Sequence, residues 1–351
     1  MGNISQAITI NASVVAASTL LTQYGTPAIV GESTYSTKDT PKKYTSLTTV
    51  GTDHGTTSKV YIAAKAAFEQ GVRAIYAVAI NASIAGTPTA TEVETALATL
   101  GAFATNHLIT GVCLAGIGSD KDTLTAKLKT FAEANGLIFT VTNANGATVA
   151  EIAADATALS SANGFFLAHA DSDQTGDVAA AALGTLSVLK PWVTPYWKKI
   201  TSDVNVYFTP ADGATLEAAK VNYILDLGDG VNRMSQALTT LTTGTPKFID
   251  ITRSKYYIAL TLQNAIAQYR IATEKIPYTA TGLKYISGEL SGALETLITA
   301  GAISEYTVIM PEITGIDAAD IEDRKLTGVK VSGTLAGDMH EFEIDLTLEA
   351  I

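Results

Sequence analysis

Short apolar segments alternate with amphipathic helical segments through residues 57–190, and this rhythm constrains the fold more than any other feature of the sequence. The strand-like segments are apolar on both faces, as RAIYAVAI at 73–80 illustrates. Strands of this composition belong to parallel sheets that are buried on both sides, and helices make the crossovers between them. The sequence therefore predicts an α/β fold in which helices cover a mainly parallel sheet.

The element boundaries follow from apolar spacing and from Gly, Asn and Asp at the segment ends. The expected helices span 57–71, 90–103, 119–136, 147–161 and 177–189, and the expected strands span 27–31, 73–80, 107–116, 137–142 and 164–170. Residues 33–58 are rich in Thr, Ser and Gly and predict a long loop with short strand pieces. The stretch 191–245 is less regular. From there to residue 248 we expect a strand at 203–210, a helix at 214–225, and two strands or a strand and a turn at 232–248.

Toward the C-terminus the order changes, and long helices precede short strands. Apolar residues at helical spacing predict helices at 252–275 and 281–301. The expected strands that follow are 304–312, 328–337 and 340–351. This order is typical of an α+β domain. The expected division is therefore an N-terminal arm at 1–20, an α/β domain at 21–245, an α+β domain at 246–338 and a C-terminal arm at 339–351.

Both arms show the period-two pattern of a strand with one apolar face. The apolar positions are Ile4, Ile8, Ile10 and Val14 in the first arm, and Phe342, Ile344, Leu346 and Leu348 in the second. Chain termini are usually the poorly ordered part of a domain. Such regular strands at both ends need a partner sheet, because a strand leaves backbone N–H and C=O groups unpaired along each edge.

The fraction of charged residues and the net charge limit the classes of protein to which the chain can belong. Charged residues make up 16% of the chain, against about 25% in an average soluble protein. Two interpretations remain open: other subunits cover part of the surface, or the surface is rich in Thr, Ser and Asn. The net charge of −11 argues against nucleic-acid binding, which requires a basic face.

Metal-binding and catalytic motifs are weak. Cys113 lies in an apolar run and is expected in the core, and the four histidines have no metal-ligand spacing. Asp171, Asp173 and Gly176 partly match a calcium loop that lacks its final Glu. Asp171, Asp173 and Asp177 therefore form a weak metal candidate, beside the simpler interpretation of a polar loop that caps a helix. The Gly116-x-Gly118 turn lacks the third Gly of a dinucleotide fingerprint. We expect no enzyme activity and no cofactor.

We find no targeting signal in the sequence and expect a protein that is made in the cytoplasm. The N-terminus has no basic region before an apolar stretch, so no signal peptide is expected. No run approaches 18 apolar residues, so membrane insertion is not expected.

Several stretches resemble contractile tail sheath proteins, which form the outer tube of contractile-tailed phages and related injection devices. These stretches are the D-I-x-R segment at 248–253, the Thr-Gly helix opening at 281–286, the stop at Gly301 and the alternating strand at 339–349. Residues 20–80 resemble the family more loosely, with Asp53-His54-Gly55 in place of an aromatic-Gly pair.

The resemblance implies an assembly rather than a reaction. Sheath subunits form hexameric rings that stack around an inner tube, and their terminal strands pair with small sheets in neighbouring subunits. The implied partners are further copies of the chain, the inner tail tube protein, and baseplate and tail terminator proteins. The implied location is a virion tail or contractile particle assembled in the host cytoplasm. Candidate tube contacts are the basic residues Arg253, Lys255, Arg270, Arg324 and Lys325.

Two alternative interpretations stay open at this point. One is an α/β enzyme or nucleotide-binding protein that uses 57–190, with a site at the carboxyl ends of the strands near 116–120 or 169–173. The other is a different self-assembling shell or surface-layer protein.

Overall fold

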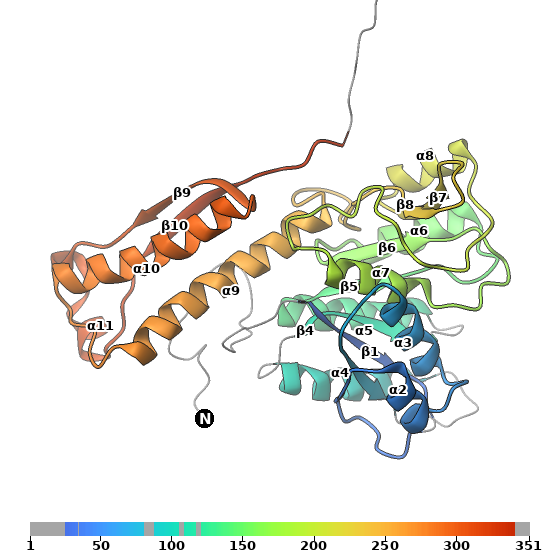
Figure 1. Ribbon diagram of the computed structural model, residues 1–351, viewed down its shortest axis with the longest axis horizontal. Coiled ribbons are helices and arrows are strands. Elements are labelled where there is room, and N and C mark those ends of the chain that lie inside the picture. Colours follow the sequence, from blue (N-terminus) through green and yellow to red (C-terminus); the bar gives the residue numbers. More distant parts are fainter. Residues whose placement is uncertain (1–24, 34, 81–87, 105–108, 117–120, 341–351) are drawn as a thin grey trace, which may run out of the picture.

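The computed structural model describes residues 25–33, 35–80, 88–104, 109–116 and 121–340 of the chain. Figure 1 shows a broad α/β part and an elongated C-terminal part, and the long helix α9 runs from one to the other. Both terminal arms that the sequence predicts fall wholly or almost wholly outside the described residues. In the described part of the chain, no helix combines the length and apolarity needed to cross a membrane.

The α/β part is built on one eight-stranded sheet. In order across the sheet, its strands are β2 (Lys42–Tyr44), β3 (Ile75–Ala79), β1 (Thr26–Gly31), β4 (Ile109–Ala115), β5 (Ile138–Val141), β6 (Gly164–Ala168), β7 (Asn222–Asp226) and β8 (Asn232–Met234). The six inner strands run parallel, and β2 and β8 pair antiparallel at the two edges. The predicted mainly parallel sheet is confirmed, since β3, β4, β5 and β6 are buried along their whole length.

Helices cover both faces of this sheet and form one hydrophobic core on each side. One face carries α2 (Leu47–His54), α3 (Lys59–Glu69) and α7 (Val178–Val188). The other carries α4 (Ala90–Ala104), α5 (Lys121–Asn135), α6 (Val149–Leu159) and α8 (Pro210–Ala218). Helix α7 is buried all round from Val178 to Leu186, and Cys113 lies in the same core, as expected. Gly184 lets α7 approach α3, because a Cβ there would stand 2.9 Å from the Ala67 carbonyl oxygen.

Helix α2 corrects the expectation of a loop over 33–58. The Ser46 side chain caps the helix by accepting a hydrogen bond from the Thr49 N–H, and Gly55, with φ of 78°, ends it. The sequence LTTVGTDH is poor in strong helix formers. Burial of Val50 and His54 against the sheet stabilises a helix that local propensity does not predict.

The strand expected at 203–210 is wrong, because residues 203–209 form no strand. The helix expected at 214–225 is right only as far as Ala218, where α8 ends, and β7 takes its later part. The chain turns at Lys220, whose φ of 64° lies in the left-handed region and ends the helical run. The stretch 232–248 contains β8 and an isolated bridge between Leu238 and Phe248, which agrees with the expected strand and turn.

The C-terminal part has the expected order of helices before strands. Its elements are α9 (Ile249–Ala272), α10 (Ala280–Thr299), β9 (Ile303–Ile309), the short helices η1 (Ile313–Gly315) and α11 (Ala318–Glu322), and β10 (Lys330–Leu335). The helix expected at 252–275 is α9, and it starts earlier, at Ile249, with Asp250 in its first turn, where a carboxylate suits the helix dipole. A third hydrophobic cluster joins α9, α10, β9 and β10.

Arg253 connects the two parts and is only 1% exposed. Its guanidinium donates hydrogen bonds to the carbonyls of Leu186 at 2.5 Å, Leu189 at 2.6 Å and Val193 at 3.3 Å. These carbonyls lie at and just beyond the C-terminus of α7, where the helix leaves acceptors without partners. The expectation that Arg253 contacts an inner tube is therefore wrong, because its side chain is buried and binds carbonyls within the subunit.

We predict that Arg253→Met lowers the free energy of unfolding by about 3 kcal/mol, because it leaves buried carbonyls unpaired while keeping most of the side-chain volume. Lys255→Met, on an exposed position of the same helix, is the matched control and should change stability by about 0.5 kcal/mol or less. Urea unfolding followed by circular dichroism measures both. Equal stabilities of the two variants would contradict the assigned role.

Candidate assembly surface

The C-terminal part carries a two-stranded antiparallel sheet made of β9 and β10. The register pairs Val331 with Val308 and Gly333 with Tyr306, with an irregularity before Leu335. In the part of the chain that the structure describes, no further strand joins this sheet. A sheet of this size is marginal by itself and needs either more strands or a helix beneath it.

Helix α10 supplies that support on one face of the small sheet. The side chains of Tyr306, Val308 and Leu335 pack on a core that includes Leu294 and Leu297 of α10. The Tyr306 hydroxyl also donates a 2.8 Å hydrogen bond to Glu295 Oε1. These contacts fix the sheet to the helix and leave its other face exposed.

Among the residues that the structure describes, no strand pairs with the outer edges of the small sheet, and the side chains on its opposite face are exposed. The outward pair Glu305 and Thr334 is joined by a 2.8 Å hydrogen bond between side chains. Ile309 near one end of the sheet is 55% exposed, although it is a large apolar residue. Outer edges of this kind offer rows of backbone N–H and C=O groups to an added strand. The arrangement can therefore accept an extended segment from another chain.

The apolar positions of both arms, from Ile4 to Val14 and from Phe342 to Leu348, lie outside the described residues. Their role in strand exchange stays a prediction.

The other basic candidates for tube contact are exposed. Lys255 and Arg270 lie on α9, and Arg324 and Lys325 follow α11. Arg270 donates a 3.1 Å hydrogen bond to the Thr273 carbonyl, and the Lys325 amine stands 4.0 Å from Asp320. These residues do not form one compact patch with Arg253, and their contact with a tube stays a prediction.

The acidic loop after β6 uses its carboxylates inside the fold. Asp171 is buried and accepts hydrogen bonds from the N–H groups of Asn205 and Val206, at 3.1 and 2.9 Å. Asp177 caps α7 by accepting from the Ala180 N–H, and desolvation raises the pKa of its carboxyl to about 6. Asp173 is exposed. Among the residues described, no three His, Cys, Asp or Glu side chains are placed to share a metal ion.

The carboxyl ends of β1 and β4 mark the point where the strand order changes direction, the usual ligand position in such sheets. Gly116 lies there with φ of 69°, and the aliphatic part of Lys59 packs directly over it, where a Cβ at position 116 would collide. Residues 117–120 of the predicted nucleotide turn lie outside the described residues. At the other predicted site, His169 is buried, and burial lowers the pKa of its imidazole.

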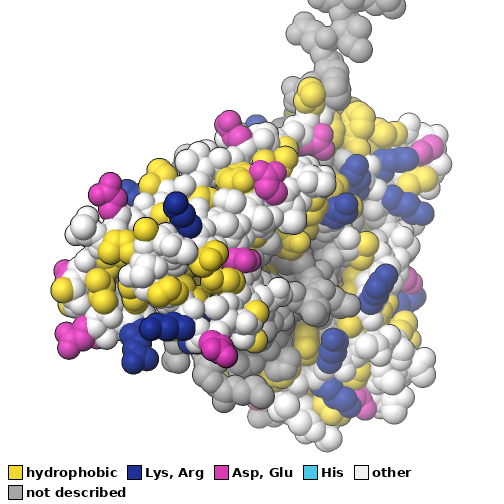
Figure 2. Space-filling model, turned by 60° about the vertical axis from the view of Figure 1, so that its left-hand side comes forward, with side chains coloured by type: hydrophobic (Ala, Val, Ile, Leu, Met, Phe, Trp, Pro, Cys, Tyr) yellow, Lys and Arg dark blue, Asp and Glu magenta, His cyan; other side chains and the backbone are white. Residues whose placement is uncertain are grey.

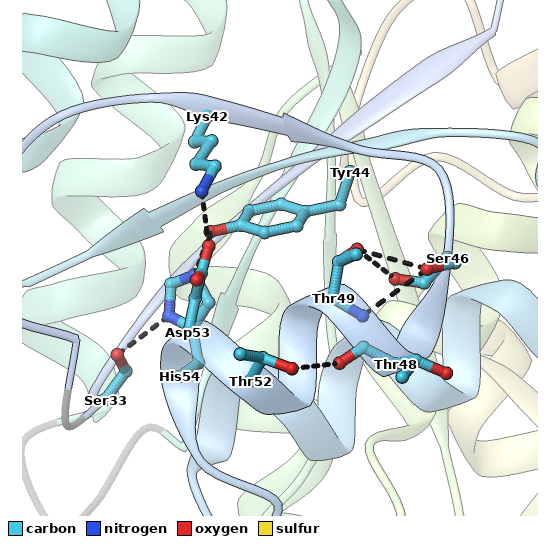
Figure 3. Close-up of polar contacts among 9 residues, drawn as sticks. All are labelled: Ser33, Lys42, Tyr44, Ser46, Thr48, Thr49, Thr52, Asp53 and His54. Atoms are coloured by element: carbon cyan, nitrogen blue, oxygen red, sulfur yellow. Dashed lines mark hydrogen bonds and ion pairs between the residues drawn. The ribbon is translucent and has the colours of Figure 1, made fainter.

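A polar cluster around His54 was not predicted from the sequence (Figure 3). The Ser33 hydroxyl lies 2.7 Å from His54 Nδ1, and the Tyr44 hydroxyl lies 3.0 Å from His54 Nε2. Tyr44 also donates a 2.8 Å hydrogen bond to Asp53, which accepts a 2.5 Å bond from Lys42. Irregular spacing from 33 to 54 gives no sequence signal for such a cluster.

This cluster differs from a nucleophilic triad. The Asp53 carboxylate contacts Tyr44 and Lys42, while the imidazole nitrogens lie within hydrogen-bond distance of the Ser33 and Tyr44 hydroxyls. Ser33, whose hydroxyl contacts the imidazole, is 8% exposed and accepts a hydrogen bond from the Tyr35 N–H. Burial of His54 lowers its pKa to about 4. The cluster is suited to fixing α2 against β2 with a neutral imidazole.

Comparisons with known proteins give a fold but no sequence relative. No model of a protein family matches the sequence, and no curated protein matches it. Among solved structures, the contracted helical sheath of the anti-feeding prophage contains a chain with a TM-score of 0.70 and 13% identity, over 97% of this chain and 97% of that chain. The contracted sheath complex of the extracellular contractile injection system PVC gives a TM-score of 0.69 and 13% identity, over 96% of both chains.

A crystal structure of a sheath tail protein from Listeria innocua matches with a TM-score of 0.63 and 10% identity, over 90% of this chain and 96% of that chain. These similar structures are sheath proteins rather than enzymes. The chain therefore has the fold of contractile sheath proteins, and the fold that the resemblance implied is confirmed.

We predict that the His54 cluster makes stability fall on mild acidification. The imidazole pKa is about 4 in the folded protein and about 6.5 in an unfolded chain. Between these values the unfolded state binds the extra proton, so stability is retained above pH 6.5 and lost as the pH falls toward 4. We expect a loss on the order of 2 kcal/mol in the free energy of unfolding between pH 7 and pH 4.5.

The measurement is urea unfolding of the wild type and His54→Gln at both pH values. The variant should be less stable at pH 7 and show a smaller drop at pH 4.5. The same drop in both proteins would contradict the prediction.

Proposed function

We propose that the chain is the structural subunit of a contractile sheath, which polymerises around an inner tube and contracts to drive that tube through a target envelope. One observation carries this proposal: the fold matches sheath chains from end to end, over about the same share of both proteins. The role is structural rather than enzymatic. It requires no cofactor, since the energy of contraction lies in packing between subunits.

The small sheet gives this proposal a physical mechanism. Strands β9 and β10 have open outer edges and one face already fixed to α10. An extended segment that pairs with an edge satisfies backbone groups and adds an apolar row to the sheet. The alternating arms at 1–20 and 339–351 have the pattern for this role, so each subunit would complete the sheets of its neighbours.

Contraction would then change the packing between rigid subunits while the exchanged strands keep them connected. The division into an α/β domain at 21–245 and an α+β domain at 246–338 is part of the proposal. Further copies in stacked hexameric rings, an inner tail tube protein, and baseplate and terminator proteins are the proposed partners. The proposed location is a virion tail or contractile particle, with assembly in the host cytoplasm.

Contact with the tube is proposed for the exposed basic residues Lys255, Arg270, Arg324 and Lys325. Exposed charges act over about 8–10 Å at physiological salt. Tube binding that depends on these residues should therefore weaken as ionic strength rises.

We predict that replacing Phe342, Ile344, Leu346 and Leu348 together by Ser leaves a folded subunit that no longer forms tubes. The substitution keeps the length of the arm but removes its apolar face. The matched control replaces Glu341, Glu343 and Asp345 by Ser, on the opposite face of the same predicted strand, and should still polymerise.

Negative-stain electron microscopy scores tube formation, and circular dichroism reports the fold. Normal tubes from the apolar-face variant would show that the arm is not an exchange strand. Absence of tubes in the wild type under all assembly conditions would count against the sheath proposal itself.

A further inference from the structure

The chain leaves the small sheet at Leu335 and reaches His340 through an exposed segment. The last backbone hydrogen bond of the sheet region runs from the Ala336 N–H to the Ala302 carbonyl. Gly337, Asp338 and Met339 are exposed, and Met339 is 76% exposed. Figure 1 shows this segment crossing from β10 toward the start of α9. His340 is the next residue whose side chain contacts the body of the subunit, and it is the first residue of the terminal strand expected at 340–351.

His340 is held by aromatic rings from two other parts of the chain. Its imidazole stacks on Tyr196 with a centroid distance of 4.5 Å and an interplanar angle of 5°. Phe248 meets it edge-on, at 4.9 Å and 73°. His340 Nε2 also lies 3.1 Å from the Thr194 hydroxyl. Stacked and edge-to-face ring pairs at these distances are attractive beyond the area that they bury.

The loop that contains Tyr196 has a backbone conformation that supports the contact with His340. Tyr196 also stacks with Trp197, at 5.0 Å and 15°. Adjacent residues in an extended chain point to opposite sides, but Trp197 has φ of 54°, in the left-handed region. A bulky residue adopts that backbone only where its surroundings compensate the strain.

The same loop is tied to the junction between the two parts of the molecule. The Val193 carbonyl accepts a hydrogen bond from Arg253, and Phe248 comes directly before α9. Asp250 lies in the first turn of α9. Burial raises the pKa of the Asp250 carboxyl, and a backbone hydrogen bond and the positive charge of Arg253 act against that shift. His340 therefore contacts both the loop that Arg253 binds and the residue that precedes α9.

We propose that Tyr196, Phe248 and Thr194 form a latch for His340 that fixes where, and in which direction, the C-terminal arm leaves the subunit. Trp197 supports the ring of Tyr196. The inference rests on the proposed exchange of this arm, and it names the residues that position it. From the latch, residues 341–351 can extend at most about 36–40 Å. The acceptor sheet of a neighbouring subunit must lie within that reach.

The test compares Tyr196→Leu with Tyr285→Leu in the full chain at a concentration below assembly. Tyr285 is an exposed tyrosine on α10, away from the latch, and serves as the matched control. A Glu-specific protease cleaves after Glu341 and Glu343, and mass spectrometry follows release of the C-terminal peptides. Neither substitution changes the sequence that the protease recognises.

We expect release about tenfold faster in Tyr196→Leu than in the wild type, with no change in Tyr285→Leu. His340→Phe keeps the stacked ring and should stay close to the wild type. His340→Ala should match Tyr196→Leu, and the double variant should add little because both changes open one contact. Cleavage at other Glu residues reports global unfolding, so faster release counts only where those rates stay unchanged.

Equal release rates in Tyr196→Leu and Tyr285→Leu would overturn the latch, as would a fully additive double variant. This readout uses the unassembled subunit, so it stays valid if no tubes form. Absent tubes in the wild type would count against the sheath proposal, whereas unchanged proteolysis would count against the latch alone. If both proposals hold, electron microscopy should show fewer or less regular tubes for Tyr196→Leu than for the wild type.

Discussion

The connection between the two parts of the molecule depends on the backbone carbonyls at the C-terminus of α7. This helix is buried on all sides from Val178 to Leu186, so carbonyls at its end cannot all reach water. Arg253 supplies N–H donors to those of Leu186 and Leu189, which offsets the cost of burying acceptors without partners. Because Arg253 belongs to α9, the same contact connects the C-terminal part to the α/β core. A sheath subunit that moves as a rigid body needs such a connection.

Helix α9 extends this connection across the C-terminal part. Its 24 residues span about 36 Å at 1.5 Å per residue. The proposed latch at Phe248 and His340 lies at its start, and the small sheet packs on α10 beside it. The unit formed by α9, α10 and the small sheet would thus carry both the point where the subunit's own arm leaves and the sheet that receives a neighbour's arm. Rigid spacing between the two would determine the geometry of the polymer.

The sequence predicted the parts of the fold in which local pattern and burial agree. Strands such as β3 and β6 are apolar throughout and buried throughout, so their composition was sufficient. Helix α2 was missed because its stability comes from burying Val50 and His54, which a Thr-rich segment does not reveal. The break at Lys220 depends on one left-handed residue inside an apolar run. Arg253 was assigned to a surface because basic side chains are rarely buried without partners, and its partners lie 60 to 67 residues away.

Of the two interpretations of the low charge content, the exposed residues favour the one in which other subunits cover part of the surface. Large apolar side chains remain open across the C-terminal part: Ile271 is 69% exposed, Tyr285 56%, Ile309 55% and Val331 36%. A surface that was only rich in Thr and Ser would have few charges without exposing these residues. Scattered exposed apolar residues are ordinary on a monomer, but here they accompany a small sheet with open edges. Figure 2 shows apolar side chains gathered over this part, while Lys and Arg side chains run down the flank of the α/β part. A covered surface explains the exposed apolar residues, the open edges and the shortage of charge together, and contacts with other subunits would supply that cover.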